Sequence, residues 1–170
     1  MAPVLRRTWS PCGRTPFLRQ RTRSHQKVSM IAGLALNPGR TRLHLCFRLH
    51  PNLNLTGSEV IAFLRCLLRA FRGHIVILWD RFNPHRSAAT TAFLRTVPRL
   101  HPEFFPPYAP ELNPTEYFWS YLKNNPLSNF APVDLISLCN KTRSSGRSIQ
   151  RTQTLLRSFV HHAPLPLRIC

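Results

Sequence analysis

Apolar and polar residues alternate over residues 42–49, and this period of two is typical of a β-strand with one buried face. The apolar positions are Leu43, Leu45, Phe47 and Leu49, and the positions between them are Arg42, His44, Cys46 and Arg48. A second apolar segment precedes this one at residues 28–36, and the residues between the two segments are Asn37-Pro38-Gly39-Arg40. Because Asn-Pro-Gly is a turn signal, we predict a β-hairpin.

A helical period follows the hairpin. Thr56 stands three residues before Glu59, which is the spacing of a capping box at a helix N-terminus. Apolar residues then recur at offsets of 0, 3, 4, 7, 8 and 11, namely Val60, Phe63, Leu64, Leu67, Leu68 and Phe71. This spacing predicts an amphipathic helix that packs on the sheet, and Gly73 is a suitable stop.

Residues 75–79 are apolar at every position and are followed by Asp80. Such a run predicts a strand buried on both faces, as in parallel α/β sheets. Open parallel sheets bind their ligands just beyond the carboxyl ends of the strands. Asp80 is expected at such an end, with the preceding helix forming a right-handed crossover.

The remaining elements are predicted from shorter signals. Residues 87–94 favour a helix, residues 100–105 favour a strand, and Pro106 to Pro110 favour a rigid, extended linker. Asn113 is a candidate N-cap with Pro114 at the first helical position and Glu116 at the third. Two further helices are expected at residues 132–142 and 148–162, so the class is α/β.

The composition is that of one basic domain. The 170 residues include 24 Lys and Arg but only six Asp and Glu, which gives a net charge of +18, and 43% of the chain is hydrophobic. A positive charge of this size favours a polyanionic partner, DNA or RNA, over a basic protein without a nucleic-acid role. Residues 1–26 lack periodicity and are expected to form an irregular basic arm.

Several classes of protein are disfavoured by the same sequence. No apolar stretch reaches the length of about 18 residues that a membrane span needs, and no secretory signal follows Met1. A mitochondrial transit peptide is disfavoured because Pro3, Pro11 and Pro16 interrupt any amphipathic helix. The five cysteines contain no C-x-x-C pair, so no zinc site or disulfide framework is predicted. We expect a cytoplasmic protein without a small-molecule substrate.

Asp80 and Glu116 are the candidate metal ligands. Each has a simpler explanation, because Glu116 could cap its helix and Asp80 could bond a loop. Taken together, however, a carboxylate at a strand end and a second carboxylate in the first turn of the following helix can meet at one divalent cation.

Three strings of residues resemble the catalytic core of mariner-type transposases, in particular their bacterial insertion-sequence branch. W-D-R-F-N-P-H-R-S begins at Trp79, F-F-P-P-Y-A-P-E-L-N-P-T-E-Y-F-W-S-Y-L-K begins at Phe104, and R-T-W-S-P-C-G-R-T-P begins at Arg7. The resemblance covers roughly residues 4–138. It implies a DDE catalytic domain with an RNase-H-like, retroviral-integrase-type fold, in which a mixed sheet is flanked by helices.

The resemblance also assigns roles to residues. It implies that Asp80 is the second and Glu116 the third of three acids that hold two Mg²⁺ (or Mn²⁺) ions for cleavage and transfer of DNA strands. His85, Asn113 and Pro114 match residues that the family keeps beside the site. Arg81 stands where the family commonly has asparagine, and it is either a phosphate-binding residue or a solvated charge.

One departure from the family pattern limits this assignment. No aspartate precedes Asp80, so the first metal ligand is absent and the two-ion site is expected to be incomplete. The first central strand of the sheet is expected to be largely missing. We therefore expect an N-terminally truncated or split transposase, inactive alone, to which a second polypeptide or a full-length transposase would supply that strand. The expected parts are the arm at 1–26, a partial catalytic domain at 27–143, and a C-terminal helix and tail at 144–170.

Two other functions stay open. The chain could be a non-catalytic basic nucleic-acid-binding protein, or an unrelated small basic protein of ribosomal or organellar type. In each DNA-binding reading the candidate phosphate contacts are Arg6, Arg7, Arg14, Arg19, Arg21, Arg23, Arg81, Arg86 and Lys123.

Overall fold

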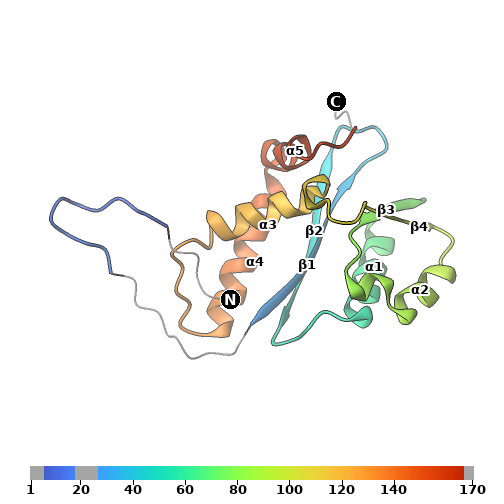
Figure 1. Cartoon of the computed structure of the whole chain (residues 1–170), viewed down its shortest axis with the longest axis horizontal. Helices are drawn as coiled ribbons and strands as arrows, with labels where there is room; N and C mark the ends of the chain where they lie inside the picture. Colours follow the sequence, from blue (N-terminus) through green and yellow to red (C-terminus); the bar gives the residue numbers. More distant parts are fainter. Residues whose placement is uncertain (1–5, 18–26, 167–170) are drawn as a thin grey trace.

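The computed structural model describes residues 6–17 and 27–166, and it contains both strands and helices. Figure 1 shows a long hairpin running between two groups of helices. In chain order the elements are β1 Val28–Leu36, β2 Leu43–Pro51, α1 Gly57–Ala70, β3 Ile75–Trp79, η1 Asn83–Arg86, α2 Ala88–Arg95, β4 Leu100–Phe104, η2 Pro110–Leu112, α3 Pro114–Asn124, α4 Leu135–Arg151 and α5 Gln153–His162. In the ranges that the structure describes, no helix is long and apolar enough to cross a membrane.

The predicted hairpin is confirmed. Strands β1 and β2 pair antiparallel with Val28 opposite Pro51 and Leu36 opposite Leu43. The turn is held by Asn37, whose side-chain oxygen accepts hydrogen bonds from the backbone N–H groups of Thr41 and Arg42, both at 2.9 Å. An asparagine at this position therefore fixes the turn by bonding the chain that returns from it.

Helix α1 begins at the predicted capping box. The backbone N–H of Thr56 donates to the Glu59 carboxylate at 2.8 Å, and the Thr56 hydroxyl accepts from Ser58 N–H at 3.3 Å. The helix ends at Ala70, and Gly73 follows with a φ of +80°, a backbone conformation that glycine adopts without strain. Its apolar stripe faces the sheets, as the helical spacing indicated.

Strands β3 and β4 pair parallel and form a second sheet, separate from the hairpin. The prediction that β3 is buried on both faces is wrong. Ile75, Ile77 and Trp79 pack against the core beside α1, whereas Val76 is 66% exposed and Leu78 is 48% exposed. Alternate side chains of a strand point to opposite faces, and those of Val76 and Leu78 pack in neither hydrophobic core of the described residues.

Two hydrophobic cores lie on opposite faces of the hairpin. The first joins Leu43 and Leu45 of β2 to Phe118 of α3 and to Leu156 and Phe159 of α5. The second joins Ile31 of β1 to α1 and to β3 and β4, through Phe63, Trp79 and Leu100. In Figure 1, α3, α4 and α5 accordingly lie on one side of the hairpin, and α1 and α2 lie on the other with β3 and β4.

Side chains cover the outer edge of β2. The Gln153 amide accepts from Leu43 N–H at 3.1 Å and donates to Leu43 C=O at 2.8 Å, while Gln150 donates to Leu45 C=O at 2.5 Å. These glutamines, from α4 and α5, occupy the positions of a further strand. They prevent the part of the edge at Leu43 and Leu45 from pairing with another chain.

Two predicted segments differ in the structure. Helix α4 runs unbroken over residues 135–151, so the expected break after residue 142 and the expected domain boundary at 143/144 both fall inside it. Its buried face contains the small residues Ser145 and Gly146, which give little hydrophobic signal. The linker is not extended, because it turns at Pro107–Tyr108, where Tyr108 has a φ of +59°, and then forms η2.

Candidate functional site

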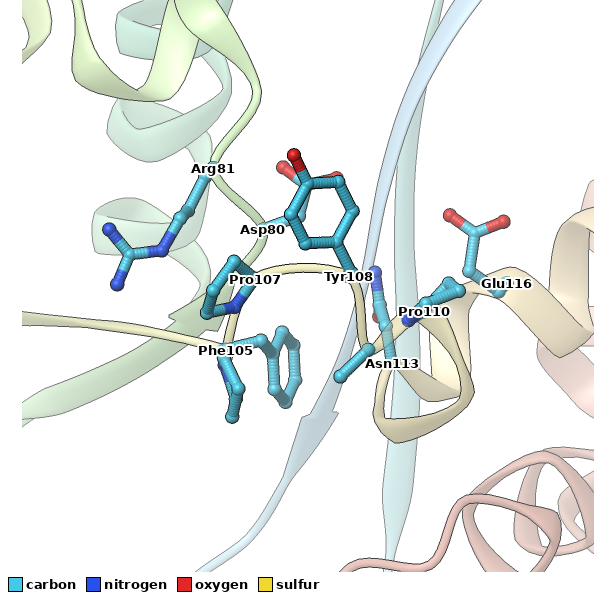
Figure 2. Close-up of a pocket in the computed structure, with 10 residues that line it drawn as sticks. Asp80, Arg81, Phe105, Pro107, Tyr108, Pro110, Asn113 and Glu116 are labelled. Atoms are coloured by element: carbon cyan, nitrogen blue, oxygen red, sulfur yellow. The ribbon is translucent and has the colours of Figure 1, made fainter.

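An open cavity of about 420 Å³ lies where the chain passes from the β3–β4 sheet to α3. Asp80, one residue beyond β3, and Glu116, in the first turn of α3, both line it (Figure 2). We call this cavity the acid hollow. Its other lining residues are Arg81, Phe105, Pro106, Pro107, Tyr108, Ala109, Pro110 and Asn113.

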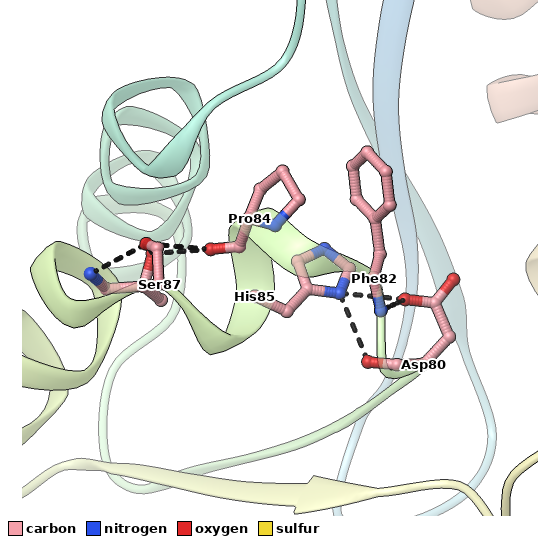
Figure 3. Close-up of polar contacts among 6 residues, drawn as sticks. Asp80, Phe82, Pro84, His85 and Ser87 are labelled. Carbon is pink, nitrogen blue, oxygen red and sulfur yellow. Dashed lines mark hydrogen bonds and ion pairs between the residues drawn. The ribbon is translucent and has the colours of Figure 1, made fainter.

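The carboxylate of Asp80 is held in one orientation by two hydrogen bonds (Figure 3). Its Oδ1 accepts from the backbone N–H of Phe82 at 3.0 Å and lies 2.8 Å from Nδ1 of His85. Because an ionised carboxylate only accepts hydrogen bonds, His85 Nδ1 carries the proton in this pair. The second oxygen, Oδ2, has no hydrogen-bonding partner among the described residues and is available to a ligand.

His85 itself is fixed by packing. Its ring stacks on that of Trp79 with centroids 4.6 Å apart and planes 10° apart, and its side chain is only 16% exposed. The 3-10 turn η1 that contains it is tied to α2, since the buried Thr90 hydroxyl donates to Pro84 C=O at 2.7 Å. The resemblance pointed to His85, and the structure gives it a physical role as the partner of Asp80.

These contacts lower the pKa of Asp80 below its ordinary value. The hydrogen bond from His85 is the largest cause, and the bond from Phe82 N–H acts in the same direction, whereas partial burial opposes both. A carboxylate whose charged form is stabilised in this way is ionised at neutral pH. Asp80 therefore presents a negative charge to the acid hollow.

Glu116 is placed by the N-terminus of α3. The Asn113 side chain accepts from Thr115 N–H at 3.1 Å, which confirms Asn113 as the N-cap, and Pro114 occupies the first helical position. The Asn113 N–H donates to Pro110 C=O at 3.0 Å, so it does not donate to the Glu116 carboxylate. The capping explanation for Glu116 is therefore wrong, because within the described residues its carboxylate has no hydrogen-bonding partner.

Tyr108 is a residue of the hollow that the sequence did not single out. Its side chain is fully exposed, and in Figure 2 its ring overlaps Asp80 in that view, with Glu116 farther to the right. The surrounding prolines indicated a stiff loop, but no signal indicated that a tyrosine would adopt a positive φ. The turn at Tyr108 directs the chain from the end of β4 towards α3.

The predicted phosphate-binding residues are dispersed. Arg81 lines the acid hollow with its guanidinium 5.6 Å from the centre of the Phe104 ring, while Arg86 in η1 and Lys123 at the end of α3 are exposed. Arg6, Arg7 and Arg14 are exposed in an irregular segment, whose Arg6 backbone is bonded at both N–H and C=O to the Asn129 side chain. Arg19, Arg21 and Arg23 lie outside the described residues.

The residues of the hollow fit a divalent metal only in part. Carboxylate oxygens are the ligands that Mg²⁺ and Mn²⁺ prefer, and Asp80 Oδ2 and the Glu116 carboxylate are both available. However, across residues 6–17 and 27–166 no group of three His, Cys, Asp or Glu side chains gathers that could hold a metal ion. Among the described residues, the hollow therefore supplies these two carboxylates.

Comparison with solved structures defines the class of this fold. The Mos1 mariner paired-end complex with Mn matches with a TM-score of 0.65 at 15% identity, over 95% of this chain and 48% of that chain. The catalytic domain of the Mos1 mariner transposase matches with a TM-score of 0.58 at 14% identity, over 81% of this chain and 76% of that chain. The fold is therefore RNase-H-like, as expected, and the chain spans about half the length of the paired-end structure.

The sequence identifies the family. The profile described as DDE superfamily endonuclease matches residues 1–138, which is most of the chain. This protein belongs to that family, so an unrelated ribosomal or organellar origin is set aside. A comparison with curated protein sequences finds no significant match.

Proposed function

We propose that this chain is catalytic-domain material of a DDE transposase in which Asp80 and Glu116 supply two of the three acids that hold divalent metal ions. The observation that carries the proposal is the position of both carboxylates on one hollow, one at a strand end and the other at a helix start. Mg²⁺ or Mn²⁺ is the expected ion, and Mn is named in one of the matched mariner complexes. When bound, such ions activate a water or a 3′-hydroxyl and stabilise the leaving oxygen at a DNA phosphodiester.

The residues around the acids have supporting tasks in this proposal. His85 and Phe82 N–H hold Oδ1 of Asp80, which leaves Oδ2 for a metal ion. The Asn113 cap fixes the first turn of α3, and thereby the backbone from which Glu116 projects. Arg81 adds a positive charge at the rim of the hollow, where a DNA phosphate would approach.

The two-ion site is incomplete in the described chain. Glu59 is bonded to Thr56 and Asp134 to Ser137, so both are committed to helix caps. Glu103 and Glu111 are exposed, and neither lines the acid hollow. With two acids the geometry of a metal pair is under-determined, so we propose that this chain alone is inactive.

The sheet edges support the idea that a strand from a second polypeptide completes the site. The outer edge of β2 is covered by glutamines, and β4 contains Pro102, a residue confined to edge strands because it cannot donate to a ladder. The other edges of β1 and β3 have no strand partner among the described residues. A strand between them would join the two sheets and end beside Asp80, where its own aspartate would complete the acids.

A complementation assay tests this function. Supercoiled plasmid is incubated with Mg²⁺ or Mn²⁺ and this chain, alone or mixed with a full-length mariner-type transposase whose own second and third acids are changed to amides. We expect nicking only in the mixture, and none when this chain carries Asp80→Asn. Nicking by this chain alone that Asp80→Asn abolishes would contradict the proposed inactivity. The absence of nicking from every mixture would contradict the completed site.

A non-catalytic nucleic-acid-binding protein is the second candidate. The net charge of +18 and the incomplete acid set favour it. In both candidates the partner is DNA, bound through phosphates, and a cytoplasmic location remains part of the proposal. The two candidates differ in Mg²⁺ dependence, since only the first predicts that metal and Asp80 affect strand cleavage.

A further inference from the structure

A second cavity, of about 290 Å³, lies between β2 and α4, and three arginines line it. We call it the arginine hollow. None of its residues belongs to the acid hollow. Its lining residues are Phe47, Arg48, Leu49, Arg143, Arg147 and Gln150.

The arginine hollow exists because α4 packs very closely on β2. A Cβ atom added to Gly146 would lie 2.6 Å from the Phe47 ring, so only glycine permits this approach. Cys139, Thr142 and Ile149 are buried on the same face of α4. Arg143, Arg147 and Gln150 each follow a buried residue by one position, so they lie on the flank of α4 next to the edge of β2.

Arg143 and Arg147 place positive charge on one flank of α4 without a neighbouring acid. The Arg48 guanidinium donates to Ala62 C=O at 3.3 Å and to Cys66 Sγ at 3.5 Å, so it is directed to α1 on the opposite face of the hairpin. Arg143 donates to Asn140 Oδ1 at 3.3 Å, which is a neutral acceptor. Within the described residues neither Arg143 nor Arg147 forms an ion pair with a carboxylate, and Arg147 has no hydrogen-bonding partner. Like charges placed together repel, and a bound anion would relieve that repulsion.

The edge of β2 is uncovered at the same place. The glutamines bond Leu43 and Leu45, which identifies the odd-numbered residues of β2 as those whose backbone groups face outward. By this alternation the N–H groups of Phe47 and Leu49 also lie on this edge, beyond the glutamine cover. The hollow thus combines guanidinium groups with backbone N–H donors, as anion sites do.

We propose that the arginine hollow binds a phosphodiester group of a nucleic-acid backbone. Guanidinium groups match phosphate oxygens with paired hydrogen bonds, and the hollow is open to a strand that passes over it. Its aromatic ring, Phe47, packs on Gly146 and is not free to stack on a base, so the contact carries no sequence preference. This inference rests on the proposed function only for the choice of DNA as the polyanion.

The test removes equal charge at two places. The full chain is compared with an Arg143→Gln/Arg147→Gln variant and with a control, Arg72→Gln/Arg95→Gln, whose exposed arginines lie outside the hollow. Binding to a labelled DNA duplex is measured by fluorescence anisotropy across a KCl series in EDTA. We expect the hollow variant to lower the slope of log K against log[KCl] by about 2, because each lost phosphate contact removes about 0.9.

The control sets the criterion. The control variant should lower the slope of log K against log[KCl] by less than half as much as the hollow variant does. Circular dichroism should confirm that both variants are folded. Equal effects of the two variants would overturn the inference and leave only diffuse electrostatic attraction. Since EDTA removes divalent ions, the result is independent of the acid hollow, and failure here would leave the proposed function standing.

A second measurement distinguishes nucleic acid from small anions. The Arg147 side-chain Nε–Hε signal is followed by NMR during titration with the duplex and, separately, with inorganic phosphate. We expect saturation at micromolar duplex but only at millimolar phosphate, with the duplex displacing the phosphate. A signal that phosphate shifts and the duplex does not would overturn the inference in favour of a small-anion site.

Discussion

Nδ1 of His85 lies 2.8 Å from Oδ1 of Asp80, and the His85 ring stacks on Trp79. The core residue Trp79 therefore fixes the position of His85, and His85 in turn holds the Asp80 carboxylate. This relationship lowers the Asp80 pKa. Replacing His85 with alanine removes the hydrogen bond that contributes most to lowering this pKa. The Asp80 pKa should therefore rise towards its ordinary value of about 3.9. Carboxyl ¹³C NMR titration measures the change. His74→Ala, in the separate His74–His101 pair, is the control and should leave Asp80 unaffected.

The same pair predicts a pH dependence of stability. Because the folded-state pKa of Asp80 is lowered, its contribution is fully present above the unfolded value of about 3.9 and is lost as pH falls through the folded value. Asp80→Asn should therefore reduce the free energy of unfolding at pH 7, by less than about 1 kcal/mol since the side chain is half exposed. The difference from the unsubstituted protein should vanish in strong acid. Urea unfolding at several pH values measures it, and a constant difference would contradict the assignment.

The acid hollow predicts weak binding of Mn²⁺ without catalysis. Paramagnetic broadening of backbone amide NMR signals should centre on residues near Asp80 and Glu116. Asp80→Asn and Glu116→Gln should each reduce the broadening several-fold, because each removes one of the two carboxylates that line the hollow. Glu111→Gln is the matched control, since Glu111 lies in the same loop but does not line the hollow. Broadening centred elsewhere would remove the metal assignment.

Close packing at Gly146 predicts that a better helix former will destabilise the protein. Alanine gains up to about 1 kcal/mol in helix propensity, but its Cβ would lie 2.6 Å from the Phe47 ring, and overpacking costs about 1–3 kcal/mol. Gly146→Ala should therefore lower the free energy of unfolding by about 1 kcal/mol. Ser148→Ala, at an exposed position of α4, should not lower it. Adding Phe47→Leu to Gly146→Ala should recover part of the loss, and simple additivity of the two changes would argue against the contact.

Signals within a few neighbouring residues predicted where helices begin. Features that depend on how distant elements pack could not be predicted from the sequence. The Thr56–Glu59 capping box and the Asn113 cap are complete within four residues, so the sequence alone locates both helix starts. The exposure of Val76 could not be predicted, because it depends on which layer covers β3. The positive φ of Tyr108 has no sequence signal in a residue that is not glycine.

The site was predictable to a similar degree. The sequence predicted that Asp80, at a strand end, and Glu116, in the first turn of the next helix, would lie near each other, and both line one hollow. This prediction needed only the direction of β3 and the position of the helix that follows the loop. The arginine hollow was missed because Phe47 and Arg143 come from distant parts of the sequence. Their meeting depends on the approach that Gly146 permits, and a glycine inside a helix gives no indication of its neighbour.

The division into two cores sets an order for folding during synthesis. The core around Phe63 and Trp79 uses residues from Ile31 to Leu100, so it can close once the chain through Leu100 has left the ribosome. The core around Leu43 must wait for Phe159 and relies on contacts distant in sequence, which form slowly. Until then the Leu43 face of the hairpin is bare, and its β2 edge lacks its glutamines. The nascent chain therefore passes through a stage in which this strand is the segment most prone to aggregate.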